Sequence, residues 1–483
     1  MAEFSRREFM KTVTTTAIGA GLVSCASSSS WMKAVGANGD VRIGVVGIRS
    51  KGAHHIEQFR QLPGVRVVAL CDVDQNILDR EVQKFKDRKE KVEAYRDVRN
   101  LLDNKEIDAV VIATPNHWHS LISIWACQAG KDVYVEKPVS HNIWEGGQLV
   151  KAAGRYNRIV QAGTQNRSDT GLQEAIRYIQ EGNLGKIVLA RGLCYKVRDS
   201  IGKVDGPQDP PATVDYNLWT GPAPLLPLRR KRLHYDWHWV WPTGNGDIGN
   251  QGIHEMDIAR WALGENELAP SVVSVGGRFG YDDDGQTPNT QFAFFKYKTA
   301  PLIFEVHGLT RTKDLRARDI YRGISIGNVI HCENGYFAGG WAYDNDGKKI
   351  KQFVRDGGKD HAANFIKAVR SRKRSDLGAD ILEGHISSAL CHMANISYRI
   401  GKKSMPEEIA GVMKDNEYAM ETFDRFRKHL AIHDVDLEKI RAILGPTLSM
   451  DTGKQKFKGV HSDWANYYIS RNYRKPFVVP GKI

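Results

Sequence analysis

Hydrophobic runs and helical repeats alternate along the first third of the chain. Residues 41–47 form one apolar run, and residues 65–71 form a second. Between these runs, apolar side chains recur at helical spacing (Ile56, Phe59 and Leu62). Short apolar runs are typical of buried strands, and a spacing of three or four positions is typical of one face of a helix. The pattern predicts a strand–helix–strand unit.

The alternation continues further along the chain. Apolar runs at residues 107–113 and 131–136, and one ending at residues 161–163, predict three more strands. A helix is expected over residues 120–129. Strands that alternate with helices form a parallel, doubly wound sheet, which binds ligands at the carboxyl ends of its strands. We therefore expect an α/β Rossmann domain over residues 40–165.

Strand-like runs dominate the middle of the chain. They lie at residues 187–197, 271–279, 291–297 and 302–307. Such runs predict a large mixed or antiparallel sheet in an α+β domain, to which we assign residues 166–440. Residues 441–483 hold many aromatic side chains without clear periodicity. We expect this segment to wrap around its own domain or a neighbouring subunit.

The N-terminal segment, residues 1–39, contains the features of an export signal in their usual order. Arg6 and Arg7 precede a weakly apolar run at residues 13–23, and small residues and Cys25 follow it. The run is shorter than the roughly 20 apolar residues that span a bilayer. These features predict twin-arginine export and lipid attachment at Cys25, with a serine-rich tether behind it.

This signal predicts a periplasmic protein that is held at the outer membrane by its lipid anchor alone. Ala26, after the cysteine, provides no acidic retention signal. Twin-arginine export carries folded proteins, commonly with a cofactor bound, so we expect the cofactor to leave the cytoplasm with the protein. The alternative interpretation is a disordered basic N-terminus.

The composition shows a positively charged chain and argues against a nucleic-acid site, a zinc site and a disulfide framework. The chain has 483 residues and a net charge of +13, with basic runs at residues 229–232 and 370–374. No nucleic-acid-binding motif accompanies them, so we expect no nucleic acid and interpret the runs as solvated faces or as sites for acidic sugars or lipid headgroups. The five cysteines after Cys25 show no Cys-x-x-Cys spacing, which indicates neither a zinc site nor a dense disulfide framework.

The turn after the first predicted strand has the pattern of a dinucleotide-binding loop. Gly47 and Gly52 occupy the first and sixth positions of the glycine pattern, but Arg49 replaces the middle glycine. Asp72 ends the second strand, where a carboxylate accepts ribose hydroxyls and repels a 2′-phosphate. These residues predict a site for NAD rather than NADP. Two alternatives stay open at Arg49, a side chain that binds phosphate and a domain that has lost its nucleotide.

Two further strand-end segments carry polar motifs. Residues 113–119 read Ala-Thr-Pro-Asn-His-Trp-His, and residues 136–138 read Glu-Lys-Pro. Together with the predicted sheet, these motifs resemble the Gfo/Idh/MocA family of sugar-type oxidoreductases. In that family an Asn-x-x-His turn lines the cofactor, and a Glu-Lys-Pro loop with a cis peptide presents a lysine to nicotinamide and substrate. The resemblance implies bound NAD and adds six side chains to its site: Thr114, Asn116, His117, Glu136, Lys137 and Gln165.

Lys137 also has a physical rationale of its own. A lysine at a strand end can hydrogen-bond a hydroxyl or ketone oxygen, and neighbouring positive charge lowers its pKa toward a range that suits proton transfer. An exposed lysine before a turn proline is the alternative. Within this run of strand-end motifs we expect Lys137 to be catalytic.

A glycine-rich segment in the second domain supplies the other candidate catalytic group. Asn250, His254 and Asp257 are spaced by four and three positions, which places them on one face of a predicted helix. In the family, a helix at this point offers an Asp and, four residues later, a His beside the substrate; here Asn250 fills the Asp position. An amide cannot take a hydroxyl proton, so that role falls to His254 and Lys137. Asn250 and Gln251 are then expected to position substrate hydroxyls.

The other residues near this helix admit more than one role. Asp257 is expected to face the substrate or to orient His254, with a core salt bridge as the alternative. Trp239 belongs to an aromatic segment, residues 234–241, and is expected to stack on a sugar face, although packing between domains explains this segment equally well. His254 as a metal ligand, together with nearby histidines and carboxylates, is a further alternative. No spacing among these residues is specific to a metal, so we predict no metal site.

These features predict an exported, NAD-dependent oxidoreductase that interconverts a hydroxyl and a keto group on a sugar or glycoside. In the family the second sheet often forms an oligomer interface, so we expect a homo-oligomer. Because the periplasm offers no NAD pool, we expect the cofactor to be bound tightly and regenerated in place.

Two alternative functions stay open. One is an NAD-dependent glycosidase that oxidises a sugar transiently and eliminates the aglycone, although glycosidases of the family usually lack the Glu-Lys-Pro loop. The other is a sugar-binding lipoprotein without redox chemistry, for which Arg49 and Asn250 are the arguments.

Overall fold

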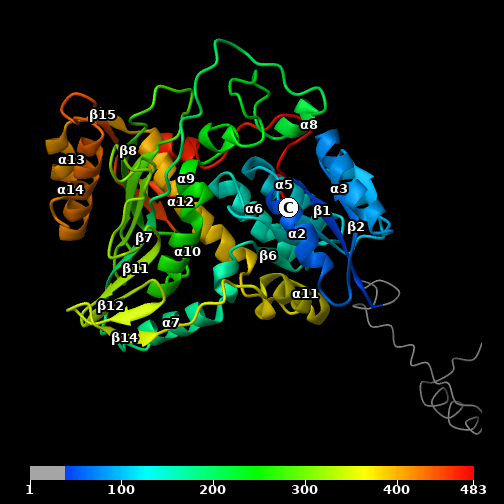
Figure 1. Cartoon of the computed structure of the whole chain (residues 1–483), viewed down its shortest axis with the longest axis horizontal. Coiled ribbons are helices and arrows are strands. Elements are labelled where there is room, and N and C mark those ends of the chain that lie inside the picture. The colour runs from blue at the N-terminus through cyan, green and yellow to red at the C-terminus, as the bar shows by residue number, and fades with distance from the viewer. Residues whose placement is uncertain (1–38) are drawn as a thin grey trace, which may run out of the picture.

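The computed structural model describes residues 39–483 as two domains that lie side by side (Figure 1). The predicted export signal, including the lipidation site Cys25, lies outside the described residues. Among the described residues, no helix is both long and apolar enough to cross a membrane.

The first domain is built on a parallel sheet of six strands in the order β3-β2-β1-β4-β5-β6. This is the strand order of a Rossmann fold, which reverses between β1 and β4 and opens a ligand crevice there. The strands are β1 (Val41–Val46), β2 (Val65–Cys71), β3 (Glu93–Tyr95), β4 (Ala109–Ile112), β5 (Asp132–Val135) and β6 (Val160–Ala162). The predicted parallel sheet is confirmed.

Helices cover both faces of this sheet, because successive side chains of a strand point to opposite faces. Val110 packs with one group of helices, and Val111 packs with the other. The first group is α4 (Val98–Asp103), α5 (Asn116–Gln128) and α6 (Ile143–Arg155). The second is α2 (Lys51–Arg60), α3 (Gln75–Asp87) and α11 (His361–Ser371), which returns from much later in the chain.

The second domain contains the predicted mixed sheet, which has twelve strands. Its main path runs β14-β13-β12-β11-β7-β10-β9-β8-β16-β15, and β17 pairs with both β18 and β8. β7 and β10 pair in parallel, whereas their other neighbours are antiparallel. The strands are β7 (Ile187–Cys194), β8 (Ser271–Gly277), β9 (Thr290–Phe295), β10 (Leu302–His307), β11 (Ile326–Cys332), β12 (Gly335–Ala338), β13 (Trp341–Tyr343), β14 (Lys349–Gln352), β15 (Lys402–Ser404), β16 (Ala442–Leu444), β17 (Leu448–Asp451) and β18 (Lys456–Lys458).

The second sheet packs helices on both of its faces. α10 (Gly252–Leu263) and α12 (Ile381–Arg399) lie on the side of the first domain, and α13 (Pro406–Met413) and α14 (Glu417–Ile432) lie on the outside (Figure 1). Successive side chains of β8 point to opposite faces of the sheet. Val272 therefore packs in the core with α10 and α12, and Val273 packs with α14. Shorter elements complete the domain: α7 (Thr170–Gln180), α8 (Tyr216–Thr220), α9 (Gly246–Asn250), α15 (Ser462–Tyr467) and the 3-10 turns η1 (Gln165–Ser168), η2 (Asp236–Trp239) and η3 (Arg374–Asp376).

Residues 441–483 contact both domains. Their first part supplies β16, β17 and β18 to the second sheet. Further on, Phe477 is buried in the core that α5 and α6 share, and the carbonyls of Pro480 and Gly481 accept hydrogen bonds from Gln148 Nε2 of α6 at 2.6 and 3.0 Å. This segment therefore ties the second domain to the first.

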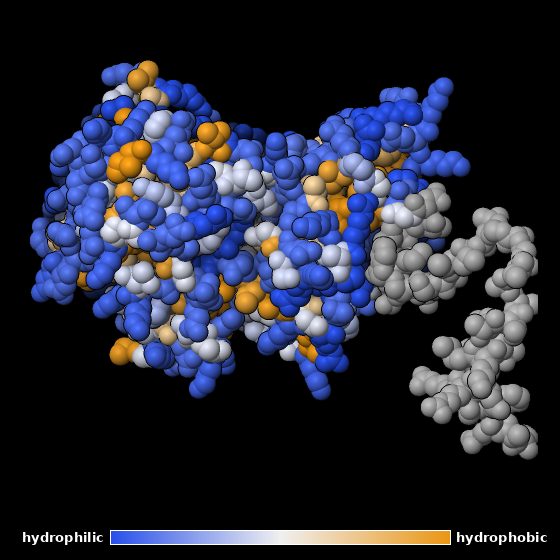
Figure 2. Space-filling view, turned by 90° about the horizontal axis from the view of Figure 1, so that it is seen from below, coloured by the Kyte–Doolittle hydropathy of each residue, from blue (hydrophilic) through white to orange (hydrophobic). Residues whose placement is uncertain are grey.

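Some of the most exposed apolar side chains belong to this same segment. The face drawn in Figure 2 is mostly hydrophilic, with apolar residues in small groups. By contrast, Val460 is 96% exposed, Trp464 70% and Tyr467 66%. The homo-oligomer expected from the sequence stays a prediction.

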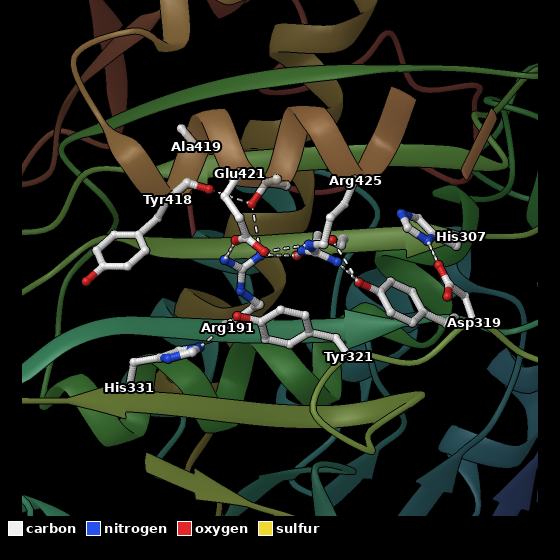
Figure 3. A network of polar contacts seen from close by, with 12 residues as sticks. Arg191, His307, Asp319, Tyr321, His331, Tyr418, Ala419, Glu421 and Arg425 are labelled. Atoms are coloured by element: carbon white, nitrogen blue, oxygen red, sulfur yellow. Dashed lines mark hydrogen bonds and ion pairs between the residues drawn. The ribbon is translucent and has the colours of Figure 1, made fainter. Parts of the chain in front are cut away.

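A buried ion-pair network joins the second sheet to α14 (Figure 3). Glu305 of β10 accepts from Arg191 of β7 and from Arg425 of α14, both at 2.5 Å, and from the hydroxyl of Tyr195 at 2.8 Å. Burial alone favours the neutral acid, but the charges of Arg425 and Arg191 lower the pKa of Glu305 to about 2. Arg191 also pairs with Glu421, which reaches solvent.

Replacing Glu305 with Gln is expected to lower the free energy of unfolding by about 3–5 kcal/mol, because it leaves buried guanidinium groups without their charge partner. Glu421→Gln removes a half-exposed partner of the same arginine and is expected to cost about 1 kcal/mol or less. Urea denaturation of the two variants measures the difference, and equal losses would contradict the assignment.

Candidate active site

A cavity of about 470 Å³ lies where the two domains meet. Its floor consists of the carboxyl ends of β1 and β2 and the loops that follow β4 and β5. The second domain closes it with residues 234–238 and with the chain at α9 and α10. This position, outside the carboxyl ends of the strands where the strand order reverses, is the ligand site of open parallel sheets.

The phosphate loop is packed too tightly for side chains at its two glycines. A Cβ on Gly47, which has a φ of 76°, would lie 2.7 Å from the backbone nitrogen of Thr114. A Cβ on Gly52 would lie 1.8 Å from the carbonyl oxygen of Gly47. Arg49, at the position of the missing middle glycine, lines the cavity and donates to the carbonyl of His234 at 3.2 Å. The loop therefore keeps the close approach of helix and strand that a nucleotide site needs.

Asp72 is held at the end of β2 by two backbone amides. Its Oδ2 accepts from Ile48 N, and its Oδ1 accepts from Asp74 N, both at 3.0 Å. Burial raises the pKa of Asp72, while these hydrogen bonds favour the carboxylate. Asp72 lines the cavity, and each of its oxygens, with one amide bonded, has a second lone pair with which a carboxylate can accept from a ribose hydroxyl.

A segment of the second domain crosses over the cofactor side of the cavity. The carbonyl of Thr213 accepts from Gln75 N at 3.0 Å, and Asp215 N donates to the carbonyl of Val73 at 3.0 Å. Further along the same segment, His234 Nε2 lies 2.9 Å from Asp74 Oδ2. Residues 213–234 therefore contact the turn between β2 and α3 at both ends of the segment. Figure 1 shows α8, which belongs to this segment, beside α3.

The turn after β4 brings Asn116 to the cavity but turns His117 away. α5 begins at Asn116, so Asn116 and His119 share a helical face that lines the cavity. The prediction that His117 contacts the cofactor is wrong: its ring is buried against Trp219, and its Nε2 lies 3.0 Å from the carbonyl of that residue. His119 lies at the cavity instead, with its ring between the carbonyls of Thr114 and Pro138 at 2.6 Å each.

The Glu-Lys-Pro loop presents its lysine to the second domain. The peptide before Pro138 is cis. Lys137 Nζ donates to the carbonyl of Asn250 at 2.5 Å, and burial lowers the pKa of Lys137. Glu136 accepts from His55 Nε2 at 2.8 Å; although burial favours the neutral acid, this bond and nearby positive charge hold the pKa of Glu136 well below its usual range.

His254 shares the cavity with Lys137 and Asn250. Its side chain is 9% exposed, and its Nδ1 has no hydrogen-bond partner among residues 39–483. Burial, together with the charge of Lys137, lowers the pKa of His254 to about 3. The imidazole is therefore neutral near pH 7, and one of its ring nitrogens is free to bond a ligand.

Two of the predicted substrate contacts on this segment, Asp257 and Gln251, do not line the cavity. Asp257 is buried in the core, where it accepts from Arg167 Nε at 2.9 Å and from Ser387 Oγ at 2.6 Å. Gln251 Nε2 donates to Glu255 Oε1 at 3.0 Å. The expected single helix breaks at Gln251 into α9 and α10, which changes the faces that these side chains occupy.

The aromatic segment contributes different residues from the one predicted. Trp239 is buried under the guanidinium of Arg198, whose Cζ lies 5.1 Å from the ring centroid, so its assignment to the substrate is wrong. Tyr235, Trp237 and His238 line the cavity instead. The 3-10 turn η2 explains the difference, because it points neighbouring side chains in different directions.

The residues at the cavity fit a dinucleotide. Of the predicted cofactor contacts, the cavity is lined by Gly47, Arg49, Asp72, Thr114, Asn116, Glu136, Lys137 and Gln165. Gly52 packs behind the loop. Among residues 39–483, Thr114 Oγ1 is buried without a hydrogen-bond partner, which leaves it ready for a ligand. His119 holds the histidine position of the Asn-x-x-His motif that begins at Asn116, so that spacing could have identified it in place of His117. His55 could not be found from sequence, because its partner Glu136 lies 81 residues further along the chain.

One group of possible metal ligands occurs elsewhere among the described residues. Ligand atoms of His307, Asp319 and His429 lie within 4.8 Å of one another. His307 Nδ1 is 2.7 Å from Asp319 Oδ2, and the two imidazole rings stack at 4.2 Å. None of the three lines the cavity, so the group is separate from the candidate active site.

Family models match both domains. A model of the Gfo/Idh/MocA oxidoreductases, described as an oxidoreductase family with an NAD-binding Rossmann fold, matches residues 41–164. The model for the C-terminal alpha/beta domain of the same family matches residues 180–303. Together they cover about half of the chain, and the Rossmann domain is thus an NAD-binding one.

Curated relatives match over a shorter stretch. A glycosyl hydrolase family 109 protein of Shewanella sp. is 38% identical over 120 residues, 24% of this chain and 26% of the relative. An alpha-N-acetylgalactosaminidase of Shewanella oneidensis is 36% identical over 120 residues, with the same coverage. The match therefore spans about a quarter of the length of these relatives.

Solved structures share the fold over most of the chain. The WlbA dehydrogenase of Bordetella pertussis, in complex with NADH and UDP-GlcNAcA, has a TM-score of 0.54 and 20% identity, covering 73% of this chain and 94% of that one. A scyllo-inositol dehydrogenase of Lactobacillus casei, with bound NAD(H) and scyllo-inositol, has a TM-score of 0.51 and 17% identity, covering 74% and 95%.

Asp72→Asn is expected to weaken NAD binding about tenfold, because an amide is a poorer acceptor for ribose hydroxyls than a carboxylate. Asp79→Asn removes the same charge from an exposed position on α3 and serves as the control. Titration of the purified proteins with NAD, after removal of any cofactor that copurifies, measures both affinities. Equal affinity in the Asp72 variant and the wild type would exclude the assigned role.

Proposed function

Because the chain belongs to the Gfo/Idh/MocA oxidoreductase family, we propose that it is an NAD-dependent enzyme that interconverts a hydroxyl and a keto group on a sugar or glycoside. The observation that carries this proposal is the convergence of Lys137 and His254 on the cavity that also holds the NAD-binding loops. The dehydrogenase structures named above, with their sugar and inositol ligands, support the substrate class.

In the proposed reaction, Lys137 is the general base and acid for the proton of the substrate hydroxyl. A lysine in its neutral form takes the proton when the alcohol is oxidised and returns it when the ketone is reduced. Burial, which lowers the pKa of Lys137, increases the fraction of this neutral form near pH 7. NAD, when bound, supplies the acceptor for the hydride.

His254 and Asn250 orient the substrate around that lysine. Because the pKa of His254 is about 3, its neutral imidazole is a poor base but a good hydrogen-bonding group at pH 7. The carbonyl of Asn250 holds Lys137 Nζ. Asn250 also lines the cavity; its Nδ2 lies 3.5 Å from Asp247 Oδ1, so its Oδ1 is the atom that would accept from a second hydroxyl. The proton role that the sequence divides between Lys137 and His254 therefore falls mainly to Lys137.

We further propose that the cofactor is retained through many turnovers. Residues 213–234 close the cofactor side of the cavity. They contact the turn between β2 and α3, and the carbonyl of His234 accepts a hydrogen bond from Arg49. An exported enzyme needs such retention, because it meets no NAD pool outside the cytoplasm. Oxidation of one sugar is then coupled to reduction of a second, or of the same sugar later.

A glycosidase is the second candidate function, and the matches to glycosyl hydrolase family 109 proteins favour it. The same lysine and histidine would serve a transient oxidation at one carbon, which permits elimination of the aglycone. The two functions differ in product, since one yields a keto-sugar with its aglycone attached and the other yields free sugar and free aglycone.

Lys137→Met is expected to lower kcat by about a thousandfold or more, with NAD still bound, because the hydroxyl proton loses its acceptor. Lys151→Met, on the outside of α6, is the matched control. Mass spectrometry of the cofactor, and of the products from a panel of sugars and glycosides, distinguishes a keto-sugar product from free sugar and free aglycone. Wild-type protein that neither carries nor binds NAD, or a fully active Lys137 variant, would exclude the proposal.

We also propose that the chain is exported by the twin-arginine route and anchored through Cys25. Replacing Arg6 and Arg7 with Lys is expected to leave most of the protein in the cytoplasm. Cys25→Ala is expected to release the protein from the membrane without blocking export. Cell fractionation with an antibody measures both, and unchanged membrane association in the two variants would contradict the signal.

A further inference from the structure

A second cavity lies behind the catalytic loop and shares no lining residue with the first. It has a volume of about 540 Å³ and is bounded by the start of α6, the chain after η2, helix α12 and residues 466–472. Asn245 separates the two cavities. Its Oδ1 accepts from Asn116 Nδ2, on the catalytic side, at 3.0 Å, and its Nδ2 donates to the carbonyl of His141 at 3.2 Å.

The lining of this cavity is positively charged. It contains Arg399 and Arg471 and has no Asp or Glu. Glu145 compensates Arg471, with an Nε–Oε1 distance of 3.0 Å. The guanidinium of Arg399 stacks on Trp241 and Tyr468, with its Cζ 4.9 and 4.1 Å from the ring centroids, and no carboxylate among residues 39–483 pairs with it.

A guanidinium that lies over two aromatic rings has already lost much of its conformational freedom, and Arg399 is still exposed. It therefore presents fixed donors to a planar anion at little further cost in entropy. A carboxylate matches these donors in a bidentate geometry. The cavity thus favours a ligand that carries a carboxylate.

The rest of the lining is suited to hydroxyl groups. His392 and Asn395 are 3% and 4% exposed, and among residues 39–483 His392 Nδ1 and Asn395 Oδ1 have no hydrogen-bond partner. Burial lowers the pKa of His392 to about 3, so its ring is neutral. The ring of Tyr467, which is 66% exposed, lies at the same cavity and offers a face for stacking.

We propose that the second cavity binds a sugar acid, that is, a polyhydroxylated ring that carries a carboxylate. Arg399 binds the carboxylate, the amides and neutral imidazoles bind hydroxyls, and Tyr467 packs on the ring. The site lies outside the redox cavity and does not depend on the proposed reaction. Its occupant touches His141 and Asn142, a few residues after the catalytic Lys137.

Calorimetric titration of the full-length, NAD-loaded protein with glucuronate, glucose and acetate tests this proposal. Glucuronate is expected to bind about tenfold or more tightly than glucose or acetate, because only glucuronate satisfies both the charged and the hydroxyl-binding groups. Arg399→Gln is expected to remove this preference. Arg427→Gln is the matched control, because Arg427 is an exposed guanidinium that stacks on an aromatic ring, Phe423, on the distant helix α14.

Three outcomes would overturn the proposal. The first is glucuronate binding no tighter than acetate, and the second is equal glucuronate affinity in the wild type and in Arg399→Gln. The third is loss of glucuronate binding in Lys137→Met but not in Arg399→Gln, which would place the ligand in the catalytic cavity. If Arg399→Gln does not fold, Tyr467→Ala at the exposed edge replaces it, with the same expected loss of affinity.

Discussion

A single contact between the domains organises the candidate active site: the ammonium of Lys137 meets the carbonyl of Asn250. This carbonyl is available because α9 ends at Asn250, so it lies in the last turn of a helix, where carbonyls lack partners within the helix and carry partial negative charge. Gly252, which follows the break, lets α10 begin close against β10, since a Cβ there would lie 2.3 Å from the ring of Phe304. The lysine comes from the NAD-binding domain, and its partner comes from the second domain. The contact therefore fixes the parts of the cavity that the two domains supply relative to each other.

The electrostatic properties of the site follow from burial and from two neighbouring charges. Glu136 stays ionised although it is buried, because His55 and nearby lysines stabilise it. Burial lowers the pKa of both Lys137 and His254, and the charge of Lys137 lowers that of His254 further. Burial, with a smaller contribution from this cation, thus keeps the adjacent imidazole neutral. The site therefore contains one amine with a lowered pKa, Lys137, and one neutral imidazole, His254, that forms hydrogen bonds but is a poor base.

Much of the fold and about half of the site could be predicted from local sequence. Apolar runs of the first domain mark its strands because those strands are buried on both faces, and glycines and polar motifs mark the strand ends because backbone and ligand approach closely there. The errors at His117, Gln251 and Asp257 share one cause: a helix began or broke at a residue that periodicity alone does not reveal. His55 and Arg399 escaped prediction because their partners lie far away in the chain, whereas His119 was marked by the Asn-x-x-His spacing from Asn116.

The return of α11 to the Rossmann domain has a consequence for biosynthesis. Phe365 of this helix is buried in the core beside β1 and α2, yet it leaves the ribosome about 200 residues after β6. Until then, the nascent first domain exposes the apolar face that α11 will cover. The growing chain is therefore vulnerable to aggregation over this interval, and a chaperone that shields that face would raise the yield of folded protein.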